Sequence, residues 1–458
     1  MTTTQTTVED LIGQGQASLS ANAISDAVRF FREALALDPE NGMAKAGLGL
    51  GLVVSEKFEA ALPLLEQAIS SIPRDTRLLD ALAIAYLHTG MPKKAEMVLR
   101  KSLRLGGSKT DTMINLASVL NECGKFADAE AMFRSCLRRN PEHALARYNL
   151  GLLELLKGNL ESGWDGFELR NKVIGRDAPT WADQCPAPMW NGENLNGKTI
   201  LVYAEQGLGD TIQFVRFAKS LADMNARVVL QCQRVLVEFL SDVEGVSECI
   251  AVDEAPQDVD FKVSLLSLPF YLGITLETIP APIPYIHVDH SKLQEWRQKL
   301  SGADGRPKVG IAWSGNPDNK TDYKRSIPLN LMQPLLTQED VSFFSLQVGD
   351  AADQVLELGK ADRPGQMFEE KLPFQDVAAA IQCLDLVISV DTALAHLSGA
   401  IGKPVWTLIT HFPDWRWMLN RNDTPWYPDM RLFRQPSVGD WPSTIEDVRK
   451  ALSSHRFS

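Results

Sequence analysis

The 458-residue sequence lacks several features that mark specialised classes of protein. It has no run of 18 or more apolar residues, so it predicts no transmembrane helix. The opening stretch MTTTQTTVEDLIGQGQ has neither a basic region nor an apolar core, so it predicts no signal peptide. Basic residues number 46 against 58 acidic ones, and the resulting net charge of −12 argues against nucleic-acid binding.

Cysteine is also scarce, with six residues and no C-x-x-C pair. This spacing argues against a disulfide or zinc framework and favours reduced thiols in a cytoplasmic protein. Hydrophobic residues make up 45% of the chain and charged residues 23%, which are ordinary values for a globular protein. The length predicts two to four domains.

The first third of the sequence repeats itself with a period of 34 residues. Pro39, Pro73 and Pro141 follow this period, and Gly107 fills the intermediate place. Small residues recur at two fixed positions, Ala27, Ala61, Ala95 and Ala129 at one and Gly15, Gly49, Ala83 and Ala117 at the other. Small residues let paired helices approach closely, and proline ends the second helix of each pair.

The pattern resembles tetratricopeptide repeats, with four full copies over residues 8–143. A degenerate fifth copy runs from Ala144 through GWDGFELR, so the array is predicted to cover residues 8–170. A solenoid of stacked helix pairs is a binding surface and not a catalytic site. The alternative is that the repeats only support the rest of the chain.

After a connector rich in Pro, Gly and Asn (171–197), short apolar runs alternate with helical patterns. The first set comprises TILVYA, RVVLQC, SECIAV and FKVSLL, and the second comprises KVGIAW, SFFSLQ, LDLVISV and PVWTLI. Two such sets predict two parallel-sheet α/β lobes, at residues 198–285 and 305–453.

The first glycine loop, EQGLGD, follows the first strand of the first lobe. Ile212 stands where a dinucleotide fingerprint needs its third glycine, and the G-K-[ST] ending of a P-loop is absent. The loop supplies one carboxylate, Asp210, at the start of a helix. Asp210 is either a helix cap or a general base facing the cleft between the lobes.

Two further loops follow strands of the second lobe. Ser314 and Gly315 precede a run that contains Lys324 and Arg325, which is either a solvated surface or a diphosphate clamp. The other loop runs from Asp391 into DTALAHLSGAIGKPVW. His396 follows Asp391 by five residues, so we expect it to lie on a different face of the helix from Asp391. It is either a core residue or a functional one.

Together, EQGLGD, AWSGNP…KRS, SLQ and DTALAHLSGAIGKPVW resemble glycosyltransferase family 9, the heptosyltransferase-type enzymes. With the repeats, the whole chain resembles bacterial tetratricopeptide-repeat glycosyltransferases. The resemblance implies a GT-B fold of two Rossmann-like lobes, with the acceptor on the first and a nucleotide-sugar held mainly by the second. It also implies no cofactor and no obligatory metal.

The resemblance assigns roles to individual residues. Asp210 matches the base that deprotonates the acceptor hydroxyl, and Asp391 is similar to the acid that grips sugar hydroxyls. Lys324 or Arg325 would neutralise the donor phosphates. The remaining donor-binding assignments are Gly207, Gly209, Ser314, Gly315, Gln347, Thr392, Ala393 and His396. Ala393 departs from the family, since heptose enzymes often carry glycine there, and the first lobe is short for this fold.

Two other patterns have weaker claims to function. Asp258-Val-Asp260 fits the D-x-D metal pattern of other glycosyltransferases, but it directly precedes FKVSLL and is interpreted as the polar entry to a strand. Trp415 and Trp417, in HFPDWRWM, are candidates for lining a cleft, whereas Trp406 is expected in the core.

The sequence therefore predicts an inverting glycosyltransferase of hexosyl or heptosyl type. The repeats are expected to recruit its acceptor, for which a protein is one candidate. One alternative is a non-enzymatic repeat scaffold with a degenerate sugar-nucleotide-binding domain. Another is a transferase acting on a lipid-linked glycan or lipopolysaccharide, which an acidic chain without a long basic amphipathic helix disfavours.

Overall fold

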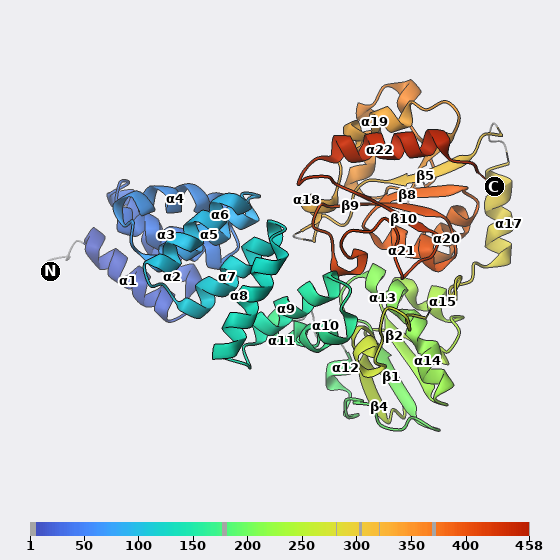
Figure 1. The fold of residues 1–458 in the computed structure, drawn as a ribbon, viewed down its shortest axis with the longest axis horizontal. Coiled ribbons are helices and arrows are strands. Elements are labelled where there is room, and N and C mark those ends of the chain that lie inside the picture. The colour runs from blue at the N-terminus through green and yellow to red at the C-terminus, as the bar shows by residue number, and fades with distance from the viewer. Residues whose placement is uncertain are drawn as a thin grey trace. The chain divides into compact units, whose positions relative to one another are not determined.

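The computed structural model describes residues 6–175, 181–280, 282–301, 305–319, 321–368 and 372–457 (Figure 1). The chain divides into two compact units, Met1–Leu153 and Glu154–Ser458. The division falls inside helix α9 (Ala144–Leu156), within the predicted fifth repeat.

The first unit consists of antiparallel helix pairs, as the repeat pattern predicts. The pairs are α1 (Val8–Ser20) with α2 (Ile24–Leu37), α3 (Gly42–Val54) with α4 (Phe58–Ser71), α5 (Thr76–His88) with α6 (Pro92–Arg104), and α7 (Lys109–Glu122) with α8 (Phe126–Arg139). The recurring alanines are buried, as is Phe31. A Cβ added to Gly15 or Gly47 would lie 2.7 Å or 2.2 Å from the Phe31 ring, so the close helix contacts require small residues.

The second unit begins with the end of α9, followed by α10 (Leu160–Phe167), α11 (Arg170–Val173) and α12 (Trp181–Gln184). The α10 and α11 segment packs against the α/β part of the chain. The Trp164 indole donates a hydrogen bond to the carbonyl of Ile274 at 2.8 Å, and Arg170 is buried. The array boundary at residue 170 stays a prediction, but these two helices belong to the second unit by their contacts.

The first lobe contains a four-stranded parallel sheet in the order β3-β2-β1-β4. Its strands are β1 (Thr199–Tyr203), β2 (Arg227–Cys232), β3 (Glu248–Ala251) and β4 (Phe261–Ser264). Its helices are α13 (Leu208–Phe214), α14 (Ala218–Asp223), α15 (Val237–Leu240) and α16 (Leu268–Tyr271). The Sγ atoms of Cys232 and Cys249, on adjacent strands, lie 3.6 Å apart, and both are free thiols.

The second lobe contains a six-stranded parallel sheet in the order β10-β9-β8-β5-β6-β7. Its strands are β5 (Lys308–Ala312), β6 (Ser342–Ser345), β7 (Gly365–Gln366), β8 (Leu386–Val390), β9 (Val405–Ile409) and β10 (Met430–Arg434). Its helices are α17 (His290–Lys299), α18 (Asp322–Arg325), α19 (Leu329–Leu336), α20 (Phe374–Gln382), α21 (Ala393–Ala400) and α22 (Trp441–Ser454). Helices α19 and α22 cover one face of the sheet, and α20 and α21 lie on the other (Figure 1).

The α/β interpretation of the sequence is confirmed. All eight apolar runs become strands, and the structure adds β7 and β10, which the sequence analysis missed. Trp406 is buried on β9, as expected. Within the described ranges, no helix is long and apolar enough to cross a lipid bilayer.

Candidate active site

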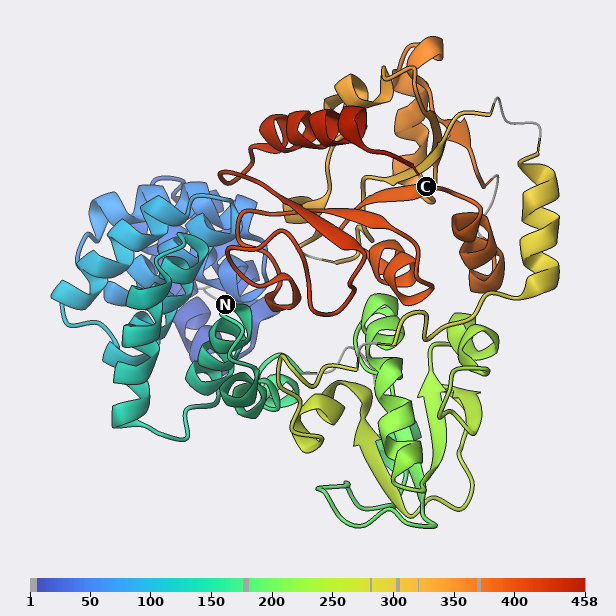
Figure 2. The same ribbon diagram turned by 45° about the vertical axis from the view of Figure 1, so that its right-hand side comes forward.

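The candidate site lies where α13 of the first lobe meets α21 of the second. The two helices pack directly against each other (Figure 2). Gly209 makes this approach possible, because a Cβ added there would lie 2.9 Å from Cδ2 of His396 and 3.5 Å from Cα of Ala393. Gly209, Ala393 and His396, all predicted for the site, therefore lie together, although they come from helices of two different lobes.

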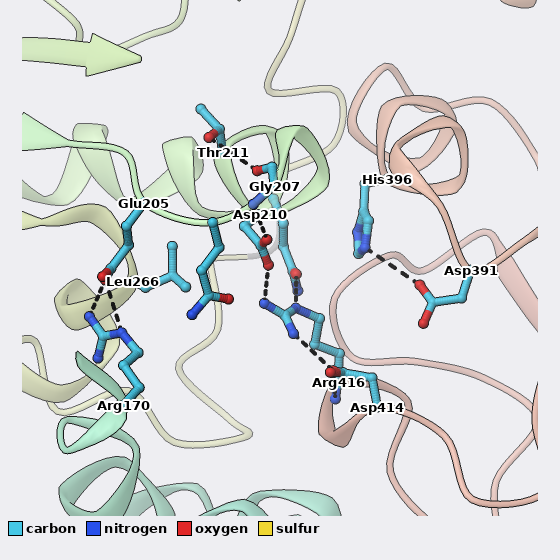
Figure 3. Close-up of polar contacts among 12 residues, drawn as sticks. Arg170, Glu205, Gly207, Asp210, Thr211, Leu266, Asp391, His396, Asp414 and Arg416 are labelled. Carbon is cyan, nitrogen blue, oxygen red and sulfur yellow. Dashed lines mark hydrogen bonds and ion pairs between the residues drawn. The ribbon is translucent and has the colours of Figure 1, made fainter. Parts of the chain in front are cut away.

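Asp210 occupies the first turn of α13, and both of its carboxylate oxygens are engaged (Figure 3). Oδ2 accepts a hydrogen bond from the backbone N–H of Gly207 at 2.8 Å, which is the capping contact that the sequence allowed for. Oδ1 forms a short ion pair with Nη2 of Arg416, from the second lobe. The side chain is 19% exposed, so it remains partly accessible.

Arg416 belongs to a 3₁₀ turn, Trp415–Trp417, in the loop after β9. Besides Asp210, its guanidinium donates to Oε1 of Gln213 at 2.7 Å and to Oδ1 of Asp414 at 2.9 Å. It also lies over the ring of Trp415, 4.5 Å from the centroid. Arg416 thus holds two acidic groups and one amide, and Asp210 and Gln213 belong to the opposite lobe.

Burial and charge shift the pKa values of these groups in ways that follow from the contacts. Desolvation raises the pKa of Asp210, with smaller contributions from Asp414 and Glu205, whereas Arg416 and the Gly207 N–H oppose the rise. Desolvation also raises the pKa of Asp391 to about 6, and the nearby charge of Asp414 adds to this effect. Asp210 and Asp391 are therefore acidic groups for which the ionised state is costly.

His396 lies close to Asp391, which contradicts our expectation that the two would not share a face. Nε2 of His396 is 3.9 Å from Oδ1 of Asp391, and Nδ1 is 3.0 Å from the Tyr427 hydroxyl. The expectation was wrong because Asp391 precedes the helix, whose N-cap is Thr392, so helical spacing does not apply. His396 is buried and stacks on Trp417, and desolvation lowers its pKa well below the usual value.

A second group of predicted residues surrounds the loop after β5. The Gln347 amide accepts hydrogen bonds from the backbone N–H groups of Trp313, at 3.1 Å, and Ser314, at 2.9 Å, so it fixes this loop. The Gly315 N–H donates to Oγ of Ser326 at 3.0 Å. A Cβ added to Gly315 would lie 2.0 Å from Oδ1 of Asp322, so glycine is needed there.

The two basic candidates of this loop differ in their surroundings. Arg325 pairs with Asp322 at 2.9 Å and is 26% exposed. It also lies close enough to Asp391 and His396 to lower both of their pKa values. Lys324 is exposed on α18. Arg325 is therefore the one of the two that the structure links to the Asp391 group.

The other candidates from the sequence have structural roles. Trp415 and Trp417 are buried, so the prediction that they line a cleft does not hold. Asp260 accepts a hydrogen bond from the Thr199 N–H at 2.8 Å and pairs with Lys198 at 3.0 Å, at the entry to β4. Within the described ranges, no three His, Cys, Asp or Glu side chains are grouped to hold a metal ion.

Two buried arginines of the site were not predicted from the sequence. Arg416 stands between the two tryptophans that were singled out, but nothing in the sequence linked it to Asp210, 206 residues away. Arg170 lies in the GWDGFELR segment and pairs with Glu205, the first residue of EQGLGD, with Nε to Oε1 at 2.9 Å (Figure 3). In both cases the available signal was an arginine in a short segment rich in aromatic residues.

Comparison with known proteins gives two family matches. A sequence model of glycosyltransferase family 9 (heptosyltransferase) matches residues 278–422, and a tetratricopeptide-repeat model matches residues 115–163. The chain thus combines a segment similar to tetratricopeptide repeats with a segment similar to glycosyltransferase family 9. The match includes Ser314, Asp391 and Arg416, whereas Asp210 lies outside it.

Several relatives extend the comparison. Protein FlbA of Caulobacter vibrioides is 25% identical over 465 residues, which cover 96% of this chain and 77% of FlbA. Tetratricopeptide repeat protein 34 of Mus musculus is 27% identical over 167 residues, covering 35% of this chain and 28% of that protein. The crystal structure of the TPR protein YrrB shares 24% identity over 36% of this chain and 84% of its own, with a TM-score of 0.31. The family 9 domain supports glycosyltransferase activity.

Proposed function

We propose that the second unit is an inverting GT-B glycosyltransferase that moves a sugar from a nucleotide-sugar to an acceptor hydroxyl. The observation that carries this proposal is the convergence of two acids from different sheets on one junction. Asp210 comes from the first lobe, Asp391 comes from the second, and Arg416 lies within electrostatic reach of both. The family 9 match over the second lobe supports a nucleotide-sugar as the donor.

In the proposed reaction, the acceptor oxygen attacks the anomeric carbon while its proton passes to the Asp210 carboxylate. The bond from the anomeric carbon to the phosphate oxygen breaks, and its electron pair leaves with the nucleoside diphosphate. Backbone N–H groups at Thr392 and Ala393, together with Lys324 and Arg325, would stabilise this leaving group. No obligatory metal enters the proposal, because these donors would carry out the neutralisation.

The donor can be tested without knowing the acceptor. All ten tryptophans lie from Trp164 onward, so tryptophan emission reports on the second unit alone. We expect one class among UDP-, GDP-, ADP- and CMP-sugars to raise its unfolding temperature. A ligand at 100 times its dissociation constant stabilises the folded state by about 2.7 kcal/mol. The absence of a shift with every class would contradict the proposal.

Two sets of variants separate the phosphate contacts from the sugar contact. Lys324→Ala combined with Arg325→Ala should weaken binding of both the nucleotide-sugar and the free nucleoside diphosphate, because its target is phosphate. Asp391→Ala should weaken only the nucleotide-sugar, because its target is the sugar. Titration calorimetry with both ligands measures the difference.

The matched control is Arg297→Ala with Lys299→Ala, a pair of exposed basic residues on α17. This control should leave both affinities unchanged. Equal losses for both ligands in both sets of site variants would contradict these assignments.

We propose that the repeats recruit the acceptor, which is a polypeptide. Tetratricopeptide repeats suggest protein interaction, and the first unit is compact by itself. A docking role for the first unit fits a division of labour in which the second unit holds the proposed chemistry.

Removal of residues 1–143 tests this role. The remaining chain keeps α9, α10 and α11, so we expect it to bind the nucleotide-sugar with near-native affinity. It should fail to modify its acceptor in cells, and isolated residues 1–143 should capture that acceptor. If the shortened chain aggregates or loses donor binding, the repeats act as structural support.

A further inference from the structure

The contact between Arg416 and Asp210 joins the two lobes at the proposed base. Arg416 is 8% exposed and comes from the loop after β9, whereas Asp210 and Gln213 come from α13. Each of its terminal groups has a partner: Nη2 faces Asp210, Nη1 faces Asp414, and Nε faces Gln213. A guanidinium held in three directions has a fixed position, and so has the carboxylate that it contacts.

We propose that Arg416 is a positioning residue for Asp210, which it keeps ionised and fixed in orientation so that the carboxylate can accept a proton. The inference rests on the proposed function, in which Asp210 is the base. In this role Arg416 contacts the base, Asp210, and acts through it without contacting the substrate.

The charges around Asp210 show why such a residue is needed. Asp414 reaches it from the Arg416 loop, and Glu205 from the loop before α13. On the α21 side stand Asp391, which is another acid, and His396, whose lowered pKa leaves it neutral. Among the residues that the structure describes, Arg416 is the cation that pairs with Asp210. Without it, a largely buried carboxyl beside Asp414 and Glu205 would take up a proton and could not act as a base.

The competing role for Arg416 is a direct contact with the donor phosphates. Two features favour positioning over that role. Its donors already face acceptors within the protein, and a phosphate at Arg416 would lie beside Asp210 and Asp414. The proposed phosphate contacts instead lie at the start of α21 and at Arg325. The two roles differ in what removal of the guanidinium does to donor binding.

The first test replaces Arg416 by glutamine in the full-length chain. The rate of nucleoside diphosphate release is followed from about pH 5.5 to about pH 9, with the nucleotide-sugar that the screen identifies. Near pH 6 we expect a loss of about 10²-fold, approaching the loss in Asp210→Asn. The rate should recover as the pH rises, because hydroxide removes the proton that Arg416 no longer repels. Arg416→Lys should keep much of the neutral-pH rate.

The matched control is Arg434→Gln. Arg434 donates to the carbonyls of Trp417 and Met418, at 3.3 Å and 2.8 Å, so it supports the same loop without touching a carboxylate. This control should change the stability of the loop without moving the pH profile. A loss in Arg416→Gln that is equal at every pH would overturn the proposal, as would a loss of nucleotide-sugar binding. Failure of the donor screen itself would instead count against the proposed function.

A second measurement needs no acceptor. In Arg416→Gln the pKa of Asp210 rises, so its ionisation costs stability as the pH increases through that pKa. The unfolding temperature of Arg416→Gln should therefore fall, relative to Arg416→Gln with Asp210→Asn, as the pH rises from about 5 to about 9. A difference that does not change with pH would show that Arg416 does not control the ionisation of Asp210.

Discussion

Asp210→Asn is expected to lower turnover by about 10²–10⁴-fold, the usual contribution of a positioned acid or base. The fold should persist, because asparagine still offers an oxygen to the Gly207 N–H and caps helices about as well as aspartate. Arg416 would keep Asp414 as its counter-charge. The measurement is nucleoside diphosphate release at saturating nucleotide-sugar, together with donor affinity, which should stay near that of the wild type.

Asp260→Asn is the matched control, because Asp260 also accepts a backbone N–H bond but lies at the entry to β4, away from α13. It should retain full turnover. Wild-type turnover in Asp210→Asn would mean that Asp210 is only a helix cap, and the proposed chemistry would then lack its base.

Arg170→Gln is expected to destabilise the second unit by about 3–5 kcal/mol, the usual result of breaking a buried ion pair. Arg170 is 1% exposed, and its partner Glu205 is 6% exposed. Oε2 of Glu205 finds no hydrogen-bond partner among the described residues, so Arg170 supplies most of the compensation for this carboxylate. Denaturation followed by tryptophan emission measures the change without interference from the first unit.

Arg227→Gln provides the comparison. Its partner is Glu248, and both side chains are nearly half exposed, so water replaces the lost contact. A change of less than about 1 kcal/mol is expected there. Equal effects of the two substitutions would show that Arg170 contributes no more than a surface residue.

The elements of the fold could be predicted from local patterns. The 34-residue period places Ala27 and Phe31 in the core, and short apolar runs mark eight of the ten strands in the described part of the chain. Strands β7 and β10 were not predicted. β7 has only two residues, and β10 mixes charged and apolar residues in the segment MRLFR. Such a segment is a poor signal until its neighbour β9 is known.

The contacts of the candidate site were harder to predict because they join residues far apart in the chain. EQGLGD and DTALAHLSGA could be found by their strand–loop–helix context. The pairing of Asp210 with Arg416 depends on how two lobes pack, which no local pattern encodes. The same holds for Asp391 and His396. Asp391 lies one residue before the N-cap of α21, outside the helix, and its carboxylate lies close to the His396 ring.

The packing of α10 and α11 has a consequence for chimeric proteins. The ring centroids of Trp164 and Trp415 lie 5.3 Å apart, and Arg170 contacts Glu205. This segment therefore supports the loop that carries Arg416 and the loop that leads into α13 and Asp210. A different recognition array grafted at residue 171 would remove these contacts. A junction within α9, ahead of Leu160, would retain these contacts, provided that the last helix of the new array continues into α9 in phase at 3.6 residues per turn. Recombination that exchanged repeats between such enzymes would meet the same restriction on where the two parents can be joined.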